Sequence, residues 1–453
     1  MMGADVAWGS EGILKKHRKL LIVLGVVAVV LVAVGVWVGV AVNRRMAQER
    51  AGIGAVTAPS APAVIDGSSE RTGAFTAEVA YTAMNAPKDA RVATTVSWND
   101  DWFFEDPAVY NHELARTCAV LSAIANSESA YYQAGSGAPA YMEDALAALG
   151  FESVSTASYG YRSEILDEVI DFFTRDDDVV AYSVASKHIT DSATGKSKVL
   201  LLVSVRGSYG AEWVSDANMG DPAALDLAQA DHEGFADAAT EIVDALAEQR
   251  NELADEASTD DIALLFCGHS RGAATANLAA SYADDMTTSL RPIANLDSIY
   301  AYTFATPTVT TMGNTGEDLY RNIFNILNPS DMVPRLPLAA WGFARYGRDL
   351  WLPEPGVDGF DGEFSAMEER YRANVGADNP SVPSDAERVD KLEADLGEQI
   401  ATKDDFATAG GVATVVKDLA TDVNAMQVLC SHYPNAYIAW MQAIDAAALR
   451  TAR

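Results

Sequence analysis

Cysteine is scarce in this chain, which has only Cys118, Cys267 and Cys430 among its 453 residues. Three widely spaced cysteines cannot form a disulfide framework, and no Cys-x-x-Cys or His-Glu-x-x-His pattern indicates a metal site. We interpret the three as buried free thiols, with one disulfide and a leftover thiol as the alternative. The sequence predicts no metal and no organic cofactor.

Basic residues are also few, since 32 lysines and arginines face 64 acidic residues and give a formal charge of −32. Nucleic acid is therefore excluded as a partner, because binding to phosphates depends on clustered positive charge. Hydrophobic residues make up 49% of the chain and aromatic residues 9%. This composition excludes wholesale disorder. The length fits two or three domains, or one large α/β domain with insertions.

One long uncharged run, Leu20 to Val42, lies near the N-terminus. Its 23 residues are long enough to cross a bilayer as a helix. Basic residues flank both of its ends, and the slightly larger number before it favours the N-terminus inside. A cleaved signal peptide is the alternative, but its apolar region usually has only 7–15 residues. We predict a single-pass signal anchor in the cell membrane, with the catalytic part outside the cytoplasm.

The remaining chain divides by composition. Residues 1–19 form a basic N-terminal segment, and 43–97 read as a flexible linker because residues 51–70 are rich in Ala, Pro, Gly and Ser. Apolar residues at helical spacing predict an N-terminal helical region over 98–178. Its expected helices lie at 110–125, 141–149 and 164–174.

Residues 179–453 show the alternation that is typical of a parallel sheet covered by helices. Strands rich in β-branched and apolar residues are expected at 178–186, 198–206, 262–267, 299–304 and 322–327, and helices at 231–249 and 273–283. We therefore predict an α/β fold with a mostly parallel sheet flanked by helices, of the α/β-hydrolase type.

The residues that carry chemistry lie at one turn, Gly268-His269-Ser270-Arg271-Gly272. A G-x-S-x-G pattern alone is weak evidence, but this one lies directly between an apolar strand and a helix of small residues. That arrangement is typical of a nucleophile elbow, in which the flanking glycines avoid steric crowding. It places the serine near a helix N-terminus that can stabilise negative charge. The competing interpretation is an ordinary strand–helix turn with a capping serine.

A serine nucleophile needs a base, and the chain has only six histidines. In α/β hydrolases the order along the chain is serine, acid, histidine, and only His432 follows Ser270. The alternative for His432 is a solvated loop residue. The histidines that we set aside are His17, His112, His188, His232 and His269.

Asp331 is the best-placed acid, because it follows a predicted strand in a loop at its carboxyl end, where active sites of open α/β sheets gather. Asp297 is the competitor, but it precedes its strand and should lie at the opposite edge of the sheet.

At these residues the sequence resembles the class 3 lipases. The resemblance extends from about Val179 to Leu352 and resumes around His432. It rests on six motifs in order, which are VLLLVSVRGSYGAEWVSD, HEGFADA, LFCGHSRGAATANLAA, YTFATPTV, ILNPSDMVPRLP and SHYPNAYIAWM.

The resemblance implies an esterase with Ser270 as nucleophile, Asp331 as orienting acid and His432 as base. The Arg-Gly-Ser of 206–208 looks like the Arg-Gly-Thr of the family. This likeness would make the backbone amides of Ser208 and Arg271 the donors of the oxyanion hole.

Some parts depart from the family pattern. About a hundred residues separate Asp331 from His432, and we predict an inserted cap or partner-facing subdomain at about 354–425. The family's lid would correspond to 215–231, which has few large apolar residues. We therefore expect monomeric or membrane-delivered acyl esters rather than emulsified droplets as substrates.

These observations predict a membrane-anchored serine ester hydrolase that cleaves acyl esters of lipids. A thioesterase, an amidase or an acyltransferase on the same fold is the first alternative, because the fold alone does not decide the bond. A non-catalytic surface binding module is the second alternative. The sequence identifies no protein partner.

Overall fold

The computed structural model describes residues 63–65, 71–83, 91–127, 141–156, 182–207, 233–253, 258–400, 402 and 430–451. Contacts divide the chain into Met1–Gly54 and Ala55–Arg453, and all described residues belong to the second unit. Within them, no helix is long and apolar enough to cross a membrane. The predicted anchor (20–42), the helix at 164–174 and the lid region (215–231) lie outside the described residues.

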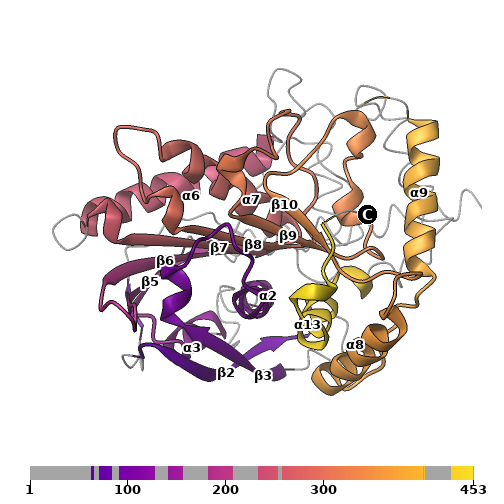
Figure 1. The fold of residues 1–453 in the computed structure, drawn as a ribbon, viewed down its shortest axis with the longest axis horizontal. Helices are drawn as coiled ribbons and strands as arrows, with labels where there is room; N and C mark the ends of the chain where they lie inside the picture. Colours follow the sequence, from indigo (N-terminus) through magenta and orange to yellow (C-terminus); the bar gives the residue numbers. More distant parts are fainter. Residues whose placement is uncertain are drawn as a thin grey trace, which may run out of the picture. The chain divides into compact units, whose positions relative to one another are not determined.

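A twisted eight-stranded sheet runs through the middle of this unit (Figure 1). Neighbouring strands from β6 to β10 are parallel, whereas β1, β4 and β5 extend the sheet with antiparallel pairs. The sheet order is β1 (Ala63–Val64), β4 (Ser153–Thr156), β5 (Tyr182–Thr190), β6 (Ser197–Val205), β7 (Ile262–His269), β8 (Ile299–Phe304), β9 (Ile323–Leu327) and β10 (Arg348–Trp351). The predicted mostly parallel α/β sheet is therefore confirmed.

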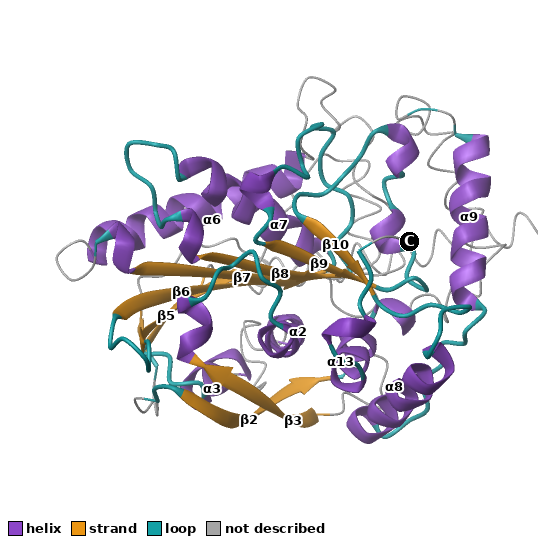
Figure 2. Ribbon diagram, in the orientation of Figure 1, coloured by secondary structure: helices purple, strands orange, loops and turns teal. Residues whose placement is uncertain are grey.

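Helices cover both faces of the sheet, as Figure 2 shows. α6 (Glu233–Glu252) and α7 (Arg271–Met286) lie on one face, and α2 (His112–Ser127) and α13 (Pro434–Ala443) on the other. Side chains alternate between the two cores: Leu264 and Phe266 pack toward α6 and α7, whereas Leu265 and Cys267 pack toward α2. Burial of both faces explains why the central strands are apolar without interruption.

A second, two-stranded sheet lies beyond α2, made of β2 (Ala74–Thr82) and β3 (Arg91–Asn99). The predicted linker over 43–97 is therefore wrong for its C-terminal part. The hairpin is held by contacts distant in sequence, including hydrogen bonds from Thr117 Oγ1 to the Ser97 carbonyl and from the Thr82 amide to Ser127 Oγ. Composition alone does not reveal such contacts. The region expected to be helical contains α2 and α3 (Tyr141–Ala148), but also strand β4.

The segment after β10 forms two helices, α8 (Phe360–Val375) and α9 (Asp385–Gln399). Phe360 and Phe364 of α8 pack their rings near Trp440 of α13. α9 packs on the loop that follows Asp331, where Arg335 binds Asp390 and Glu393. The described part of the predicted insertion (354–425) is thus built onto elements that flank the candidate site.

Short 3-10 helices occupy several connections, namely η1 (Asp100–Phe104), η5 (Thr259–Asp261), η6 (Leu296–Ser298), η7 (Asp318–Tyr320), η8 (Val333–Arg335), η9 (Ala339–Trp341) and η10 (Ala446–Ala448). The three cysteines are free and buried, as predicted.

Candidate active site

Ser270 lies at the sharp turn between β7 and α7. Its backbone has a positive φ, with φ 59° and ψ −127°, a combination that is rare for a residue other than glycine. Both flanking glycines are required by close approach. A Cβ on Gly268 would lie 2.4 Å from the carbonyl oxygen of Gly272, and one on Gly272 would lie 2.4 Å from that of Val205. The turn therefore has the strained geometry of a nucleophile elbow.

The end of β6 packs directly against this turn. A Cβ on Gly207 would lie 2.3 Å from the carbonyl oxygen of His269, and the amide of Gly207 donates to Asn126 Oδ1 at 2.7 Å. Asn126 comes from α2, so this helix fixes Gly207 just after the end of β6. Ser208, one of the two predicted oxyanion donors, lies outside the described residues. Arg271, the other, is the first residue of α7.

Asp331 and His432 form a buried pair, although 101 positions separate them. His432 Nδ1 lies 2.7 Å from Asp331 Oδ2, and both side chains are almost fully inaccessible. The amide of Val333 donates to the other carboxylate oxygen at 3.0 Å. Asp331 sits in the loop after β9, at the carboxyl end of the parallel strands. Asp297, the competing acid, lies in η6 before β8 at the other end.

Tyr437 is a site residue that the sequence did not single out. Its hydroxyl donates to Asp331 Oδ2 at 2.8 Å and accepts from the amide of Asn328 at 3.1 Å. Tyr437 follows His432 by five positions, within the same motif. Nothing local to that motif indicates that the hydroxyl reaches the aspartate, because the contact depends on how α13 docks beside β9.

His269 brings the nucleophile turn and the His432 loop together. Its Nε2 lies 2.7 Å from the carbonyl oxygen of His432, and the two imidazole rings are 4.6 Å apart between centroids. Ser270 follows His269 directly, so the serine and the predicted base lie in one buried region. Two of the histidines set aside have other partners: His112 binds the carbonyls of Met441 and Ile444, and His188 pairs with Glu152 at the surface.

Burial has the largest effect on the pKa values of Asp331 and His432. Desolvation raises the pKa of Asp331 to about 7, against the hydrogen bonds from Tyr437 and Val333 that stabilise the carboxylate. Desolvation lowers the pKa of His432 well below its usual value. At neutral pH the imidazole is therefore unprotonated on one nitrogen, as a general base must be.

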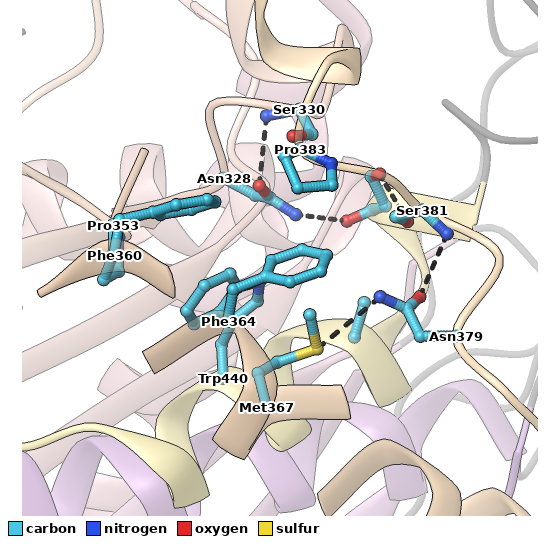
Figure 3. Close-up of a pocket in the computed structure, with 12 residues that line it drawn as sticks. Asn328, Ser330, Pro353, Phe360, Phe364, Met367, Asn379, Ser381, Pro383 and Trp440 are labelled. Atoms are coloured by element: carbon cyan, nitrogen blue, oxygen red, sulfur yellow. Dashed lines mark hydrogen bonds between the residues drawn. The ribbon is translucent and has the colours of Figure 1, made fainter. Parts of the chain in front are cut away.

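A pocket adjoins the loops that carry the pair, as Figure 3 shows. It encloses about 310 Å³ of space between atoms, part of which is open to solvent. The side-chain Nδ2 of Asn328 donates to the carbonyl of Ser431 at 2.8 Å, and the hydroxyls of Ser431 and Ser381 are 2.7 Å apart. The first bond joins the loop after β9 to the loop that carries His432, and the second joins the insertion to it. The apolar wall comprises Phe360, Phe364, Met367 and Trp440.

No group of three or more histidine, cysteine or acidic side chains within the described residues has an arrangement that could hold a metal ion. The side chains gathered in this region are a serine at a strained turn and a buried imidazole–carboxyl pair joined by a hydrogen bond.

The central part of the chain was compared with models of known protein families. Residues 202–341 match the family model described as Lipase (class 3). Over these residues the chain is similar to the class 3 lipases. The lipase segment contains Ser270 and Asp331, whereas His432 lies beyond its matched boundary. The resemblance inferred from the ordered motifs is thereby confirmed over these residues.

Two curated relatives match part of this chain. Over 187 residues the chain is 29% identical to the secreted mono- and diacylglycerol lipase A of Penicillium cyclopium, and equally to the protein of that name from Penicillium camembertii. The alignment takes in 39% of this chain and 57% of each relative, so the chain spans little more than half the length of these relatives.

Solved lipase structures are also similar to part of this chain. A mutant of MDLA from Penicillium cyclopium has 22% identity, a TM-score of 0.31 and coverage of 55% of this chain and 82% of its own. The triacylglyceride lipase of Rhizomucor miehei has 22% identity, a TM-score of 0.27 and coverage of 38% and 62%. With scores this low, the fold assignment rests on the strand order and helix layers.

Proposed function

We propose that this protein is a serine ester hydrolase that cleaves acyl esters of lipids through Ser270, Asp331 and His432. The observation that carries the proposal is the buried Asp331–His432 pair, which His269 links to the strained turn of Ser270. The relatives' activity toward mono- and diacylglycerols makes glycerol esters the first substrate class to test.

In the first half-reaction, Ser270 Oγ attacks the ester carbonyl carbon while its proton passes to Nε2 of His432. Asp331 accepts the hydrogen bond from Nδ1 and stabilises the imidazolium that forms. The carbonyl oxygen becomes negative and is stabilised by the N-terminus of α7, with the amides of Arg271 and Ser208 as the proposed donors. His432 then returns the proton to the departing alcohol.

In the second half-reaction, water attacks the acyl-Ser270 ester. His432 takes a proton from the water and gives it to Ser270 Oγ as the carbon–oxygen bond breaks, which releases a fatty acid. The proton transfers run in the reverse order of the first half-reaction, so the same three residues serve both.

The proposed location is the outer side of a cell membrane. The support is the 23-residue apolar run at 20–42, together with the secretion of the two curated relatives. A tag at the C-terminus of the full chain, expressed in cells, should be digested by added protease without lysis. The membrane fraction should retain the chain after a carbonate wash, and loss of the 1–50 segment should abolish that retention.

The test of the catalytic proposal is a fluorophosphonate probe, which reacts with activated serines. The wild-type chain should be labelled at Ser270, as read by peptide mass spectrometry, and should hydrolyse short p-nitrophenyl esters. Matched ester, thioester and amide substrates would show which bond is cleaved fastest. A chain that is folded but neither labelled nor active would contradict the proposal and favour a binding module.

Tyr437→Phe is expected to weaken the site without abolishing it. The lost hydrogen bond to Asp331 stabilises the carboxylate, so its removal raises the pKa of Asp331 further. The rate falls as pH drops through the ionisation of the Asp331–His432 pair, and this acid limb should therefore move to higher pH. A hydrogen bond to a charged group contributes about 1.5–3 kcal/mol, which bounds the expected loss of unfolding free energy.

The measurement is kcat/KM against pH for a soluble ester, with urea unfolding in parallel. Tyr433→Phe, at a buried tyrosine of the same segment that packs against Cys430 and Val333, is the matched control. An acid limb that stays in place in Tyr437→Phe would contradict this role of the hydroxyl.

A further inference from the structure

The histidine beside the nucleophile has no part in the proton transfers above. His269 is the last residue of β7, and its side chain is only 1% exposed. Burying an imidazole costs free energy that a phenyl ring of similar size would not cost. A structural filler at this position therefore has no need of ring nitrogens, and the contacts of those nitrogens indicate what the residue does.

The single hydrogen bond of the His269 side chain within the described residues is directed at the base. Nε2 lies 2.7 Å from the backbone oxygen of His432. A carbonyl only accepts, so Nε2 carries the hydrogen and donates it. Nδ1 makes no hydrogen bond among the described residues. The one hydrogen bond of this imidazole is therefore made to the backbone of His432, the proposed base.

The ring of His269 also contacts the two aromatic side chains of the Asp331 cluster. Its centroid lies 4.6 Å from that of His432 at an interplanar angle of 60°, and 5.7 Å from that of Tyr437 in an edge contact. His269 therefore fixes the His432 main chain, limits the tilt of its imidazole and supports the tyrosine that binds Asp331. The titratable groups that face it are His432, Asp331 and Tyr437.

Neutrality makes this contact compatible with catalysis. Burial lowers the pKa of His269 well below its usual value, and the neighbouring His432 lowers it as well. A neutral ring does not repel the imidazolium that forms on His432 during the reaction, whereas a lysine or arginine at this position would.

We propose that His269 is a positioning residue, which holds His432 in line with Ser270 by donating from Nε2 to the His432 carbonyl and packing against its ring. The inference rests on the proposed function. Because Ser270 and His269 are adjacent, one turn of the chain fixes both the nucleophile and the main chain of its base. A shift of about 1 Å in a reacting group can cost about 10²-fold in rate.

The test compares three variants. His269→Phe keeps the ring but removes the donor, His269→Gln places its amide nitrogen near the position of Nε2, and His269→Asn has an amide too short to reach. The phenylalanine and asparagine variants should lose about 10- to 100-fold in kcat and in fluorophosphonate labelling rate, with KM within about twofold. The glutamine variant should recover most of this loss.

His112→Phe is the matched control, because His112 also donates from Nε2 to backbone carbonyls, those of Met441 and Ile444, away from the site. It should lower the unfolding midpoint and leave kcat unchanged. If His269→Phe fails to fold, the glutamine and asparagine pair decides the question. Equal activity in that pair, or full activity in the phenylalanine variant, would overturn the inference. A wild-type chain without labelling would instead overturn the proposed function.

Discussion

Replacing His432 with alanine is expected to lower the turnover of a short p-nitrophenyl ester about 10⁶-fold. Without the imidazole, Ser270 loses the proposed acceptor of its proton, and its hydroxyl is a weak nucleophile at neutral pH. Asp331 is not expected to replace His432, because Tyr437 and the Val333 amide hold its carboxylate in place. Ser270→Ala should cause a loss of the same size.

The double variant, Ser270→Ala with His432→Ala, should be no slower than either single variant, because residues that act as one unit are not additive. His188→Ala is the control, since His188 pairs with Glu152 at the surface and should leave kcat unchanged. Circular dichroism and the unfolding midpoint check that each variant is folded. A folded His432→Ala variant within about tenfold of wild type would show that another group is the base.

The strained turn at Ser270 could be predicted from the sequence because such a strand–turn–helix is a local structure. Five consecutive residues, the strand before them and the helix after them specify it, and both glycines prove to lie against backbone atoms. The alternation of buried strands and helices is also a local pattern, so the positions of β6, β7, β8 and β9 in the chain could be predicted, but their order in the sheet was not predicted.

The supporting contacts could not be predicted because each joins segments far apart in the chain. Tyr437 reaches Asp331 across 106 positions, His269 reaches His432 across 163, and Asn126 reaches Gly207 across 81. Spacing and residue type say nothing about such docking. The β2–β3 pair was not predicted for the same reason. Its exposed and buried positions alternate only in part, and contacts from α2, which is distant in sequence, stabilise it.

Two parts of the fold contribute residues to the candidate site, namely the sheet and the C-terminal segment. The sheet side provides Ser270, His269 and Asp331 at the ends of β7 and β9, where backbone hydrogen bonding limits movement. The C-terminal segment provides His432 and Tyr437, and is held in place by Asn328 and by Ser381 of the insertion. Ser381 of the insertion thus helps to hold the segment that carries His432, the proposed base.

Asp331→Asn is expected to lower kcat about 10⁴-fold while the chain stays folded. The asparagine amide would face His432 Nδ1 with a donor in place of an acceptor, which favours the tautomer whose hydrogen is on Nε2. That tautomer cannot accept the proton of Ser270, and the imidazolium loses its stabilising charge. The loss should be measured at pH 8, where a carboxyl with a pKa of about 7 is ionised in the wild type.

Asp331→Asn should lower activity but should gain stability relative to wild type as pH rises. Because burial raises the pKa of Asp331 above its unfolded value, protonation of this carboxyl stabilises the folded wild type at low pH. That stability is lost as pH rises from about 4 to about 7. The asparagine variant does not titrate, so its unfolding midpoint relative to wild type should rise over the same range. Asp297→Asn, at the amino end of β8, is the matched control and should change neither kcat nor this pH dependence. An Asp331→Asn variant with wild-type kcat at pH 8 would leave His432 without the orienting acid that the mechanism requires.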